Sequence, residues 1–403
     1  LQIRNIALTD IPQVNITWFA QEIRNSDRVK QFIKDLSDIE IAEHYNLINN
    51  GNATNLGILW LGSSSQRSRL VYPLTVQYIV YDELEKKVRK EDWQDYSKNP
   101  KELLLDIEKQ AIELTYYDEL PDGLFRKNIR HYDNRLVREL LINAIAHKSF
   151  TISGDIFIKV YTDRLEITNP GGLPLGITKD NILHTNQRRN PHIIRILHDL
   201  KLMEGEGTGY NLIYEITSRD AKAFPVLNSD FNATSVTQYS KILDQETLLL
   251  IDFISKNYQL TQKEYIVLGI IARHQKILVT QLYKELQLTD EDRLRSYISK
   301  LLEQAILVSR GVKKGTEYLI NPKLISNAKI NIKPSLKVIE PHRLKALIEE
   351  DLKIHPNSRI SNIHTRLPDV QIEDIRKCIY KLVSDGVLQY SGGRTYREYF
   401  LAK

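Results

Sequence analysis

NRLVRELLINAIAHKS, residues 134–149, combines the pattern of an amphipathic helix with a second, polar pattern. Glu139, Asn143 and His147 recur at i, i+4 and i+8, so a helix places them along one face. Asp133 or Asn134 can cap the start of this helix. A carboxylate one turn away from an amide suits a site that holds a metal ion and activates a water, although a solvent-facing polar stripe also explains the helix alone. The apolar residues that predict the core-facing side are Leu136, Leu140, Ile142 and Ile145.

A first glycine-containing loop follows a predicted β-hairpin over residues 155–168. This loop is NPGGLP, residues 169–174, in which two glycines stand between two prolines. Such a sequence predicts a tight loop where the backbone can approach a ligand closely, and an ordinary loop is the alternative.

Two more segments precede predicted helices. In RRNP, residues 188–191, Asn190 and Pro191 are expected to cap and start a helix over residues 192–200. The two arginines could face phosphates or be surface charges. GEGTG, residues 205–209, leads into a helix over residues 210–218. Glycines at a helix N-terminus present backbone N–H groups and a favourable dipole to an anion.

These segments, in this order, resemble the motifs of a known class of ATPases. Glu139-x-x-x-Asn143, NPGGLP and GEGTG resemble the N-box and the first and second glycine boxes of the GHKL (Bergerat-fold) ATPases. The longer pattern RELLINAIAHKSF…DRLEITNPGGLP…RRNP…EGEGTGYNLI resembles a bacterial and archaeal family of proposed transcriptional regulators, the RecG-helicase-like or divergent-AAA proteins. Full-length members usually begin with a Schlafen-related, Alba-type domain. The resemblance covers roughly residues 36–240 if NNGNATNLGILWLG is counted as the tail of that domain, which is then expected to be truncated here.

The resemblance implies a role for each matching residue. Glu139 would be the general base that orients water toward the γ-phosphate, and Asn143 would bind the Mg²⁺ ion. Asn169 would stand where the family's fold has its adenine-reading acidic residue. Because an amide accepts a hydrogen bond without charge assistance, adenine selectivity is less secure with Asn169. The other residues expected to bind the ATP·Mg²⁺ cofactor are Gly171, Gly172, Gly205, Gly207, Thr208 and Gly209.

A helicase motor is excluded, because the sequence contains no G-x-x-x-x-G-K-[ST] P-loop motif. Slow ATP hydrolysis is the activity that the resemblance leaves open. His147 and Lys148 stand near the expected site without an assigned role.

The C-terminal residues predict two winged-helix domains, at 241–325 and 341–403, joined by a linker over 326–340. The first is predicted from three helices, over residues 261–273, 281–288 and 290–304, and a two-stranded wing. The second follows from an internal repeat, because residues 298–320 align without a gap on residues 379–401.

Positive charge is concentrated in these two segments. Lys and Arg outnumber Asp and Glu by 11 to 7 in residues 260–325 and by 11 to 8 in residues 341–403, whereas the whole chain carries only +5. This segregation favours double-stranded DNA as the partner. Winged helices also serve as interaction and dimerisation modules, so a homodimer is the alternative. The expected DNA contacts are Arg293, Arg295, Ser296, Ser299, Lys300, Lys313 and Lys314.

Composition sets the class of protein. A length of 403 residues with 42% hydrophobic and 27% charged residues is typical of a soluble globular protein with several domains. The single cysteine, Cys378, excludes a disulfide framework and fits a reducing cytoplasm. No apolar run is long enough to span a membrane, and no signal peptide is recognisable.

The predicted fold class is α+β. A small α+β module (1–120) precedes an α/β-sandwich GHKL ATP-binding domain (121–240), and the two winged helices follow. The predicted function is ATP-dependent, DNA-associated transcription regulation, in which the ATP·Mg²⁺ site controls DNA binding or dimer arrangement. The alternatives are an anti-phage or stress ATPase whose effector is the missing N-terminal domain, and a catalytically inactive nucleotide-binding oligomeric scaffold.

Overall fold

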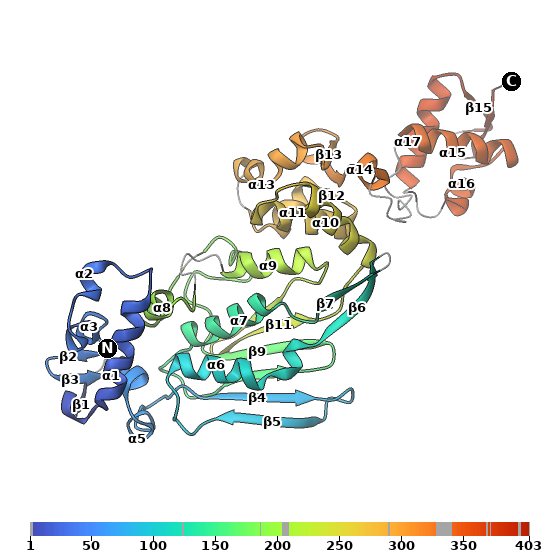
Figure 1. The fold of residues 1–403 in the computed structure, drawn as a ribbon. Helices are drawn as coiled ribbons and strands as arrows, with labels where there is room; N and C mark the ends of the chain where they lie inside the picture. Colours follow the sequence, from blue (N-terminus) through green and yellow to red (C-terminus); the bar gives the residue numbers. More distant parts are fainter. Residues whose placement is uncertain are drawn as a thin grey trace. The chain divides into compact units, whose positions relative to one another are not determined.

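A computed structural model describes residues 3–122, 125–185, 187–203, 209–288, 291–327, 341–367, 370, 372–393 and 396–402. The chain separates into two compact units, residues 1–243 and 244–403. Both units mix helices and strands, which confirms the predicted α+β class (Figure 1).

The first unit is built on a six-stranded sheet in the order β10-β11-β9-β8-β4-β5. Its strands are β4 (Val76–Tyr81), β5 (Lys87–Trp93), β8 (Ile156–Val160), β9 (Arg164–Pro170), β10 (Val226–Ser229) and β11 (Ala233–Tyr239). Only the β4–β8 pair within this sheet is parallel. Three helices lie along one side of the sheet: α6 (Pro100–Gln110), α7 (Asn134–His147) and α9 (Gly209–Arg219) (Figure 1).

Burial along the strands alternates with the pleat and determines which side chains face the helices. In β9, Leu165 and Ile167 are buried, and Asn169 is the next residue in the same series. Ile167 stands opposite the buried Ile158 of β8 in the antiparallel register. The amide of Asn169 therefore lies on the core side of the sheet, at the end of a strand.

Helix α7 forms the centre of the core. Its predicted apolar residues Leu136, Leu140, Ile142 and Ile145 are all buried, and each contributes roughly 1.5–3 kcal/mol relative to an exposed side chain. Asp133, rather than Asn134, is the N-cap, since its Oδ1 accepts from the Arg135 N–H at 2.8 Å.

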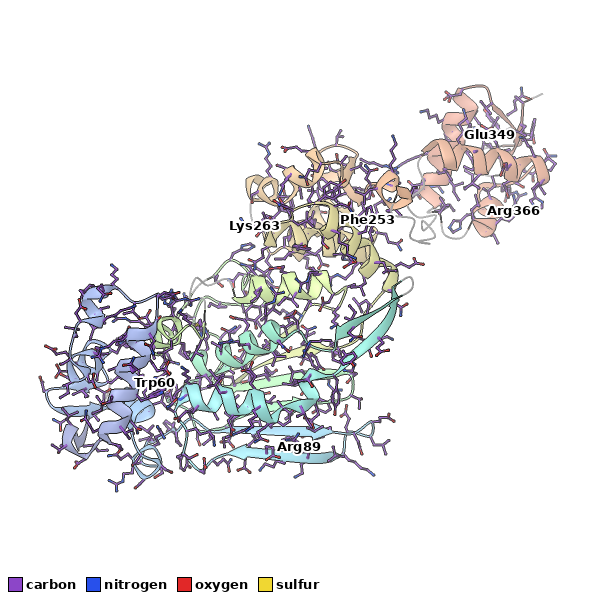
Figure 2. All side chains as sticks on the ribbon, in the orientation of Figure 1. Trp60, Arg89, Phe253, Lys263, Glu349 and Arg366 are labelled. Carbon is purple, nitrogen blue, oxygen red and sulfur yellow. The ribbon has the colours of Figure 1, made fainter. Side chains whose placement is uncertain are left out.

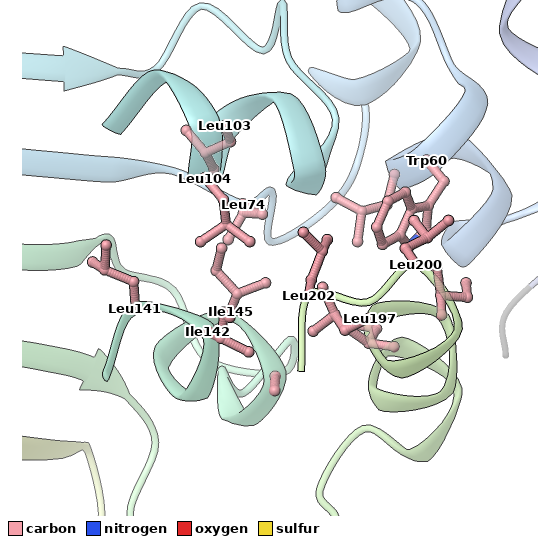
Figure 3. Close-up of a cluster of buried hydrophobic side chains, with 14 of the residues drawn as sticks. Trp60, Leu74, Leu103, Leu104, Leu141, Ile142, Ile145, Leu197, Leu200 and Leu202 are labelled. Carbon is pink, nitrogen blue, oxygen red and sulfur yellow. The ribbon is translucent and has the colours of Figure 1, made fainter. Parts of the chain in front are cut away.

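Residues 3–67 form a small module around a three-stranded sheet, β1-β3-β2. The strands are β1 (Ile3–Ala7), β2 (Ile48–Asn49) and β3 (Asn52–Thr54), and the helices are α1 (Gln13–Asn25), α2 (Gln31–Lys34), α3 (Asp38–His44), α4 (Asn55–Leu61) and α5 (Ser64–Arg67). Trp60 of α4 is fully buried in a cluster that also contains residues of α6, α7 and the end of α8 (Pro191–Asp199) (Figures 2 and 3).

Polar contacts also join this module to α8. The Tyr45 hydroxyl donates to Asp199 Oδ2 at 2.6 Å, and the Arg195 guanidinium lies 4.7 Å from the centre of the Tyr45 ring. Arg28 donates to the Met203 carbonyl at 2.6 Å, immediately after α8. The small module and the predicted ATP-binding region are therefore packed together within the first unit.

Between α6 and α7 the chain forms a β-hairpin that the sequence analysis did not predict. Its strands are β6 (Tyr117–Asp122) and β7 (Phe125–Arg130). Asn99 caps α6 and Pro100 starts it. A short 3-10 turn, Ile112–Thr115, follows α6 and leads into the hairpin.

The second unit contains two successive sets of elements. The first set comprises α10 (Gln245–Asn257), α11 (Gln262–His274), β12 (Lys276–Leu278), α12 (Val279–Glu285), α13 (Glu291–Glu303), β13 (Leu307–Arg310), β14 (Glu317–Ile320) and α14 (Pro322–Asn327). The second comprises α15 (Pro341–Ile354), α16 (Ile360–Arg366), α17 (Ile372–Ser384), β15 (Leu388–Ser391) and β16 (Glu398–Leu401). Each set includes three helices followed by a strand pair: α11, α12, α13, β13 and β14 in the first, α15, α16, α17, β15 and β16 in the second.

Helix α17 and strands β15 and β16 start 81 residues after α13, β13 and β14 (372 against 291, 388 against 307, 398 against 317), which is the offset of the sequence repeat. Helix α11 begins with a capping box, in which Thr261 and Glu264 are bonded reciprocally. In the second set, Arg366 donates to both carboxylate oxygens of Asp351 at 2.7 Å and joins α16 to α15. Within the described residues, no helix combines the length and apolar character that a membrane crossing needs.

Candidate functional site

A cavity of about 1270 Å³, open mouth included, lies in the first unit between α7, the ends of β9 and β11, and the start of α9. It brings together segments that are far apart in the sequence. The predicted site residues in its wall are Glu139, Asn143, Asn169, Gly171, Gly172 and Gly209. The wall also contains His147, Arg188, Arg189, Tyr210 and Thr234. Gly205, Gly207 and Thr208 lie outside the described residues.

Glu139 and Asn143 form a bonded pair in this wall. Glu139 is only 8% exposed, and Asn143 Nδ2 donates to Glu139 Oε1 at 3.0 Å. Because the amide nitrogen serves the carboxylate, the amide oxygen is the atom of Asn143 that can bind a cation. Among the described residues, no group of three or more His, Cys, Asp or Glu could hold a metal ion. An ion here would therefore take further ligands from a bound anion or water rather than from a protein cage.

Helix α9 begins at Gly209, directly against the Glu139–Asn143 pair. A Cβ added at Gly209 would overlap Glu139 Oε1 and lie 2.9 Å from the carboxyl carbon and 3.3 Å from Asn143 Nδ2. The first N–H groups of a helix have no partner within the helix, and its dipole favours an anion at this end. The cavity thus offers an anion-binding helix end beside a carboxylate and a potential cation ligand.

Replacing Gly209 with Ala is expected to weaken nucleotide binding by at least about tenfold, since a displacement of even about 1 Å at a reacting geometry has effects of this size or larger. Gly315→Ala is the matched control, because a Cβ there meets open space. Calorimetric titration with Mg²⁺ and an ATP analogue would measure the nucleotide affinity of both variants. Equal affinities of the two variants would contradict the assigned role of Gly209.

The loop after β9 also depends on a glycine. Gly171 has φ +98°, in the region that disfavours L side chains, and a Cβ would collide with the Arg189 guanidinium and with Ser149 Cβ. Arg189 donates to the Gly172 carbonyl. The group that lies close to the backbone of this loop is therefore the guanidinium of Arg189, a residue of the cavity wall.

Asn169 is 8% exposed, and its Oδ1 has no hydrogen-bond partner among the described residues. A buried acceptor without a partner costs about 1–3 kcal/mol, and a ligand that donates to it would remove that cost. The same cavity wall contains six apolar residues: Leu140, Ala144, Ile167, Ile194, Met203 and Val236.

The RRNP segment differs from the expectation in one respect. Pro191 starts α8 as predicted, but the Asn190 side chain does not cap that helix. It donates instead to the carbonyls of Ala146 and Lys148, at 3.0 and 2.8 Å, and satisfies the end of α7. This tertiary contact holds both arginines at the cavity. Burial lowers the pKa of the half-buried Arg189.

His147 and Lys148 have different surroundings. His147 lines the cavity, where burial, with a smaller effect of the Arg189 charge, lowers its pKa to about 4. Lys148 is fully buried, with its ammonium 5.1 Å from the centre of the Phe150 ring, and burial lowers its pKa to about 8. His147 is therefore a neutral cavity residue near pH 7, and Lys148 lies beneath the wall.

The shifted pKa of His147 predicts an acid-sensitive first unit. The folded-state pKa of about 4 lies below the usual 6.5, so the unfolded chain binds more protons between these values. Stability is then complete above pH 6.5 and falls by up to about 3 kcal/mol as the pH drops through 4. His147→Gln should reduce this loss, whereas His192→Gln, at an exposed position, should not. Urea unfolding at pH 7 and pH 5 would test this, and identical pH dependence of the two variants would contradict it.

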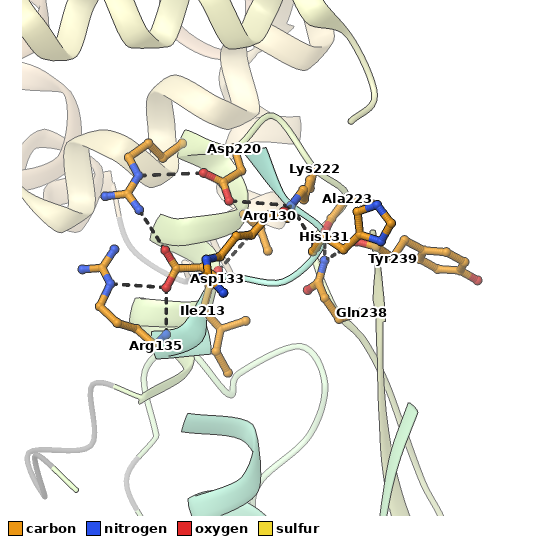
Figure 4. Close-up of polar contacts among 12 residues, drawn as sticks. Arg130, His131, Asp133, Arg135, Ile213, Asp220, Lys222, Ala223, Gln238 and Tyr239 are labelled. Atoms are coloured by element: carbon orange, nitrogen blue, oxygen red, sulfur yellow. Dashed lines mark hydrogen bonds and ion pairs between the residues drawn. The ribbon is translucent and has the colours of Figure 1, made fainter. Parts of the chain in front are cut away.

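A polar cluster fixes the ends of α7 and α9 that lie away from Gly209 (Figure 4). Arg219, the last residue of α9, lies 3.4 Å from Asp133 Oδ2 at the start of α7. Lys222 is 3.7 Å from Asp220 and donates to the backbone carbonyls of Arg130 and His131. One end of α9 is therefore anchored by charge, and its other end faces the cavity.

The predicted DNA-contacting residues lie in the second unit. Arg295, Ser296 and Ser299 are exposed on α13, and Lys313 is exposed in the turn between β13 and β14. Lys300 differs, because its ammonium donates to the Gln259 carbonyl at 2.6 Å and lies 3.6 Å from Glu264. The side chains of Arg293 and Lys314 lie outside the described residues.

Thr234 and Tyr210 also lie in the cavity wall, although no sequence motif marks them as site residues. Thr234 stands opposite Asn169 in the β9–β11 register. The sequence ATSVTQY has strand character but contains no signal for its partner strand. Arg188 and Arg189 could be phosphate-facing or surface residues by sequence alone, and the structure has both in the cavity wall.

Residues 154–237 match the protein family described as "Putative ATP-dependent DNA helicase recG C-terminal". No curated protein matches the sequence. The chain is also similar to the crystal structure of the DIP2311 protein from Corynebacterium diphtheriae, with a TM-score of 0.64 and 18% identity over 100% of this chain and 69% of that chain. At this identity the second likeness concerns the fold alone. The chain thus contains an ATPase-like domain, and Glu139 and Asn143 precede the matched residues.

Proposed function

We propose that the chain is a DNA-associated regulator that binds ATP with Mg²⁺ in the cavity of the first unit. The observation that carries the nucleotide proposal is the Glu139–Asn143 pair beneath the N-terminus of α9. The ATPase-like segment at residues 154–237 supports the same proposal.

The cavity offers groups suited to the base, to the polyphosphate and to a Mg²⁺ ion. The apolar wall suits a base, and the buried acceptor of Asn169 suits a hydrogen-bond donor on its edge. The start of α9 and the guanidinium groups of Arg188 and Arg189 offer N–H donors and positive charge to a polyphosphate. Mg²⁺, when bound, neutralises phosphate charge, and the Asn143 amide oxygen would be its protein ligand.

Glu139 is the group that can move a proton in this site. Asn143 Nδ2 donates to its Oε1 at 3.0 Å, and Gly209 packs against the same oxygen. A carboxylate held in this way can accept a proton from a water directed at the terminal phosphate. The proposed activity is slow hydrolysis of ATP, which would set the lifetime of the nucleotide-bound state.

The second unit is the proposed DNA-binding part. Its two sets of three helices and a wing-like strand pair have the composition of winged helices, and an excess of Lys and Arg supports a polyanionic partner. Arg295 and Lys313 are exposed there. The proposed control is that nucleotide binding changes the DNA affinity of this unit or its arrangement in a dimer.

The test is the salt dependence of duplex DNA binding by the full chain. Replacing Arg293, Arg295, Lys313 and Lys314 with Gln should weaken binding and reduce the slope of log K against log salt by about 3 to 4, since each lost phosphate contact contributes about 0.9. The matched control removes the same charge from the first unit, at the exposed Lys30, Lys86, Lys87 and Lys109.

Each variant is measured with and without Mg²⁺ and a non-hydrolysable ATP analogue. If nucleotide binding regulates DNA binding as proposed, the analogue must change the DNA affinity of the wild type. An equal salt slope in the two quadruple variants would contradict the DNA interface and favour a protein-interaction role for the second unit.

A further inference from the structure

The side-chain amide of Asn169 has an oxygen that no hydrogen bond holds within the described part of the chain. It is 92% buried (8% exposed), it follows Leu165 and Ile167 on the inward face of β9, and its Oδ1 has no partner among the described residues. A buried amide that served only the fold would have its oxygen satisfied by protein.

The polar neighbours of Asn169 are already bonded elsewhere. Thr234, opposite it on β11, donates its hydroxyl to the Gly171 carbonyl at 2.9 Å and lies 2.9 Å from Ser229 Oγ. The Pro170 carbonyl accepts from the Ser149 N–H at 2.9 Å. No described contact of these groups fixes which side of the Asn169 amide carries the oxygen.

An amide presents a donor and an acceptor side by side, whereas a carboxylate presents two acceptors. The Watson–Crick edge of adenine offers a donor, the N6 amino group, next to an acceptor, N1. The same edge of guanine offers an acceptor, O6, next to a donor, N1–H. A half-turn of the amide about its terminal torsion, which is broad and roughly two-fold, exchanges the pattern that Asn169 presents. Asn169 can therefore make a two-point contact with either purine.

The apolar part of the cavity wall can pack against the face of a planar base, but it offers no hydrogen bonds to the edge of the base. Ile167 and Val236 from the sheet and Leu140 from α7 line the cavity with hydrocarbon. Hydrocarbon discriminates poorly between two ligands of nearly equal size, and the larger discrimination arises where a polar group of the site is left without its partner. Adenine and guanine can each pair with both the donor and the acceptor of the Asn169 amide, so Asn169 lowers the affinity for neither base.

We propose that Asn169 is the base-reading residue and that it reads adenine and guanine alike, so the site takes purine nucleoside triphosphates as a class. This inference rests on the proposed nucleotide-binding function and adds the identity of the base to it.

The first test uses the full-length wild-type chain with Mg²⁺ and three probes in calorimetric titrations: AMP-PNP, GMP-PNP and purine riboside triphosphate, which lacks the exocyclic group. AMP-PNP and GMP-PNP are expected to have dissociation constants within about tenfold of each other, because each makes the same two hydrogen bonds. Purine riboside triphosphate, which keeps only the N1 acceptor, should bind about tenfold or more weakly than both.

The outcomes separate this inference from the proposed function. AMP-PNP binding that is more than about a hundredfold tighter than GMP-PNP binding, a discrimination typical of a site built around one polar pattern, would overturn the inference alone. Binding of none of the three probes would overturn the proposed function and the inference together.

The second test replaces Asn169 with Leu, which has a similar volume and no polar group. Affinity for AMP-PNP and GMP-PNP should fall by the same factor, about tenfold or more. Asn228→Leu is the matched control, because Asn228 lies exposed on β10 of the same sheet and outside the cavity wall. A loss confined to one of the two nucleotides would contradict the inference. The wild-type probe series decides the question without the variant if Asn169→Leu fails to fold.

Discussion

Glu139→Gln is expected to reduce ATP turnover by about 10²–10⁴-fold, the usual contribution of general acid–base catalysis, while nucleotide affinity changes little. The substitution keeps the shape of the side chain and an oxygen that can accept from Asn143 Nδ2, a bond of 3.0 Å in the wild type. It removes only the capacity to accept a proton. Phosphate release under saturating Mg²⁺ and ATP would measure turnover, and calorimetric titration would measure affinity.

Glu43→Gln is the control for this experiment, since Glu43 is an exposed glutamate of the same unit. Turnover of the Glu139 variant equal to that of the wild type would remove Glu139 as the base. A wild-type chain that binds nucleotide and releases no phosphate would instead favour the inactive, nucleotide-binding scaffold.

The second large effect is expected from Asn143→Ala, which should weaken Mg²⁺-dependent ATP binding by about a hundredfold or more. Loss of one metal-supporting contact typically costs 10- to about 100-fold, and this variant also leaves the buried Glu139 without its amide donor. Titration with and without EDTA would separate the loss of the metal contact from the loss of the amide donor to Glu139, since only the metal contact requires Mg²⁺.

Asn143→Asp provides the comparison that isolates the metal contribution. It retains an oxygen ligand but places a second carboxylate beside Glu139, so some Mg²⁺-dependent binding should return while the empty site is destabilised. Affinity for Mg²⁺·ATP that is unchanged in Asn143→Ala would show that the metal lies elsewhere.

Features set by local spacing could be predicted from the sequence. The apolar face and polar stripe of α7 follow from helical periodicity, and local spacing narrowed its cap to Asp133 or Asn134, of which the structure has Asp133. The 81-residue repeat was visible because equivalent core and turn positions recur in the same order. The glycine loops were identified because few other residues permit such backbone or such close approach.

Features set by contacts between distant segments could not be predicted in this way. Asn190 has the spacing of a helix cap, but it lies within reach of the α7 carbonyls and bonds there instead. Thr234 enters the cavity only through the β9–β11 register, which is determined by burial across the whole sheet. Lys300 has the spacing of an outward helix position, and only the tertiary packing gives it the Gln259 carbonyl as a partner.

The N-terminal residues illustrate the same limit. Nothing in the sequence around Tyr45 or Arg28 indicates that these side chains contact Asp199 and the Met203 carbonyl, more than 150 residues away. Those contacts hold α8, whose first residue, Pro191, directly follows the arginine pair and Asn190. The small module is therefore part of the framework that positions the cavity wall.

The central claim is that one cavity in the first unit binds a purine nucleoside triphosphate through Mg²⁺. Calorimetric titration of the full chain with AMP-PNP tests it most directly, with Mg²⁺ and with EDTA, on the wild type and on Gly209→Ala. We expect one site per chain that requires Mg²⁺ and is weakened by Gly209→Ala. Absence of binding, or binding that neither EDTA nor Gly209→Ala alters, would contradict it.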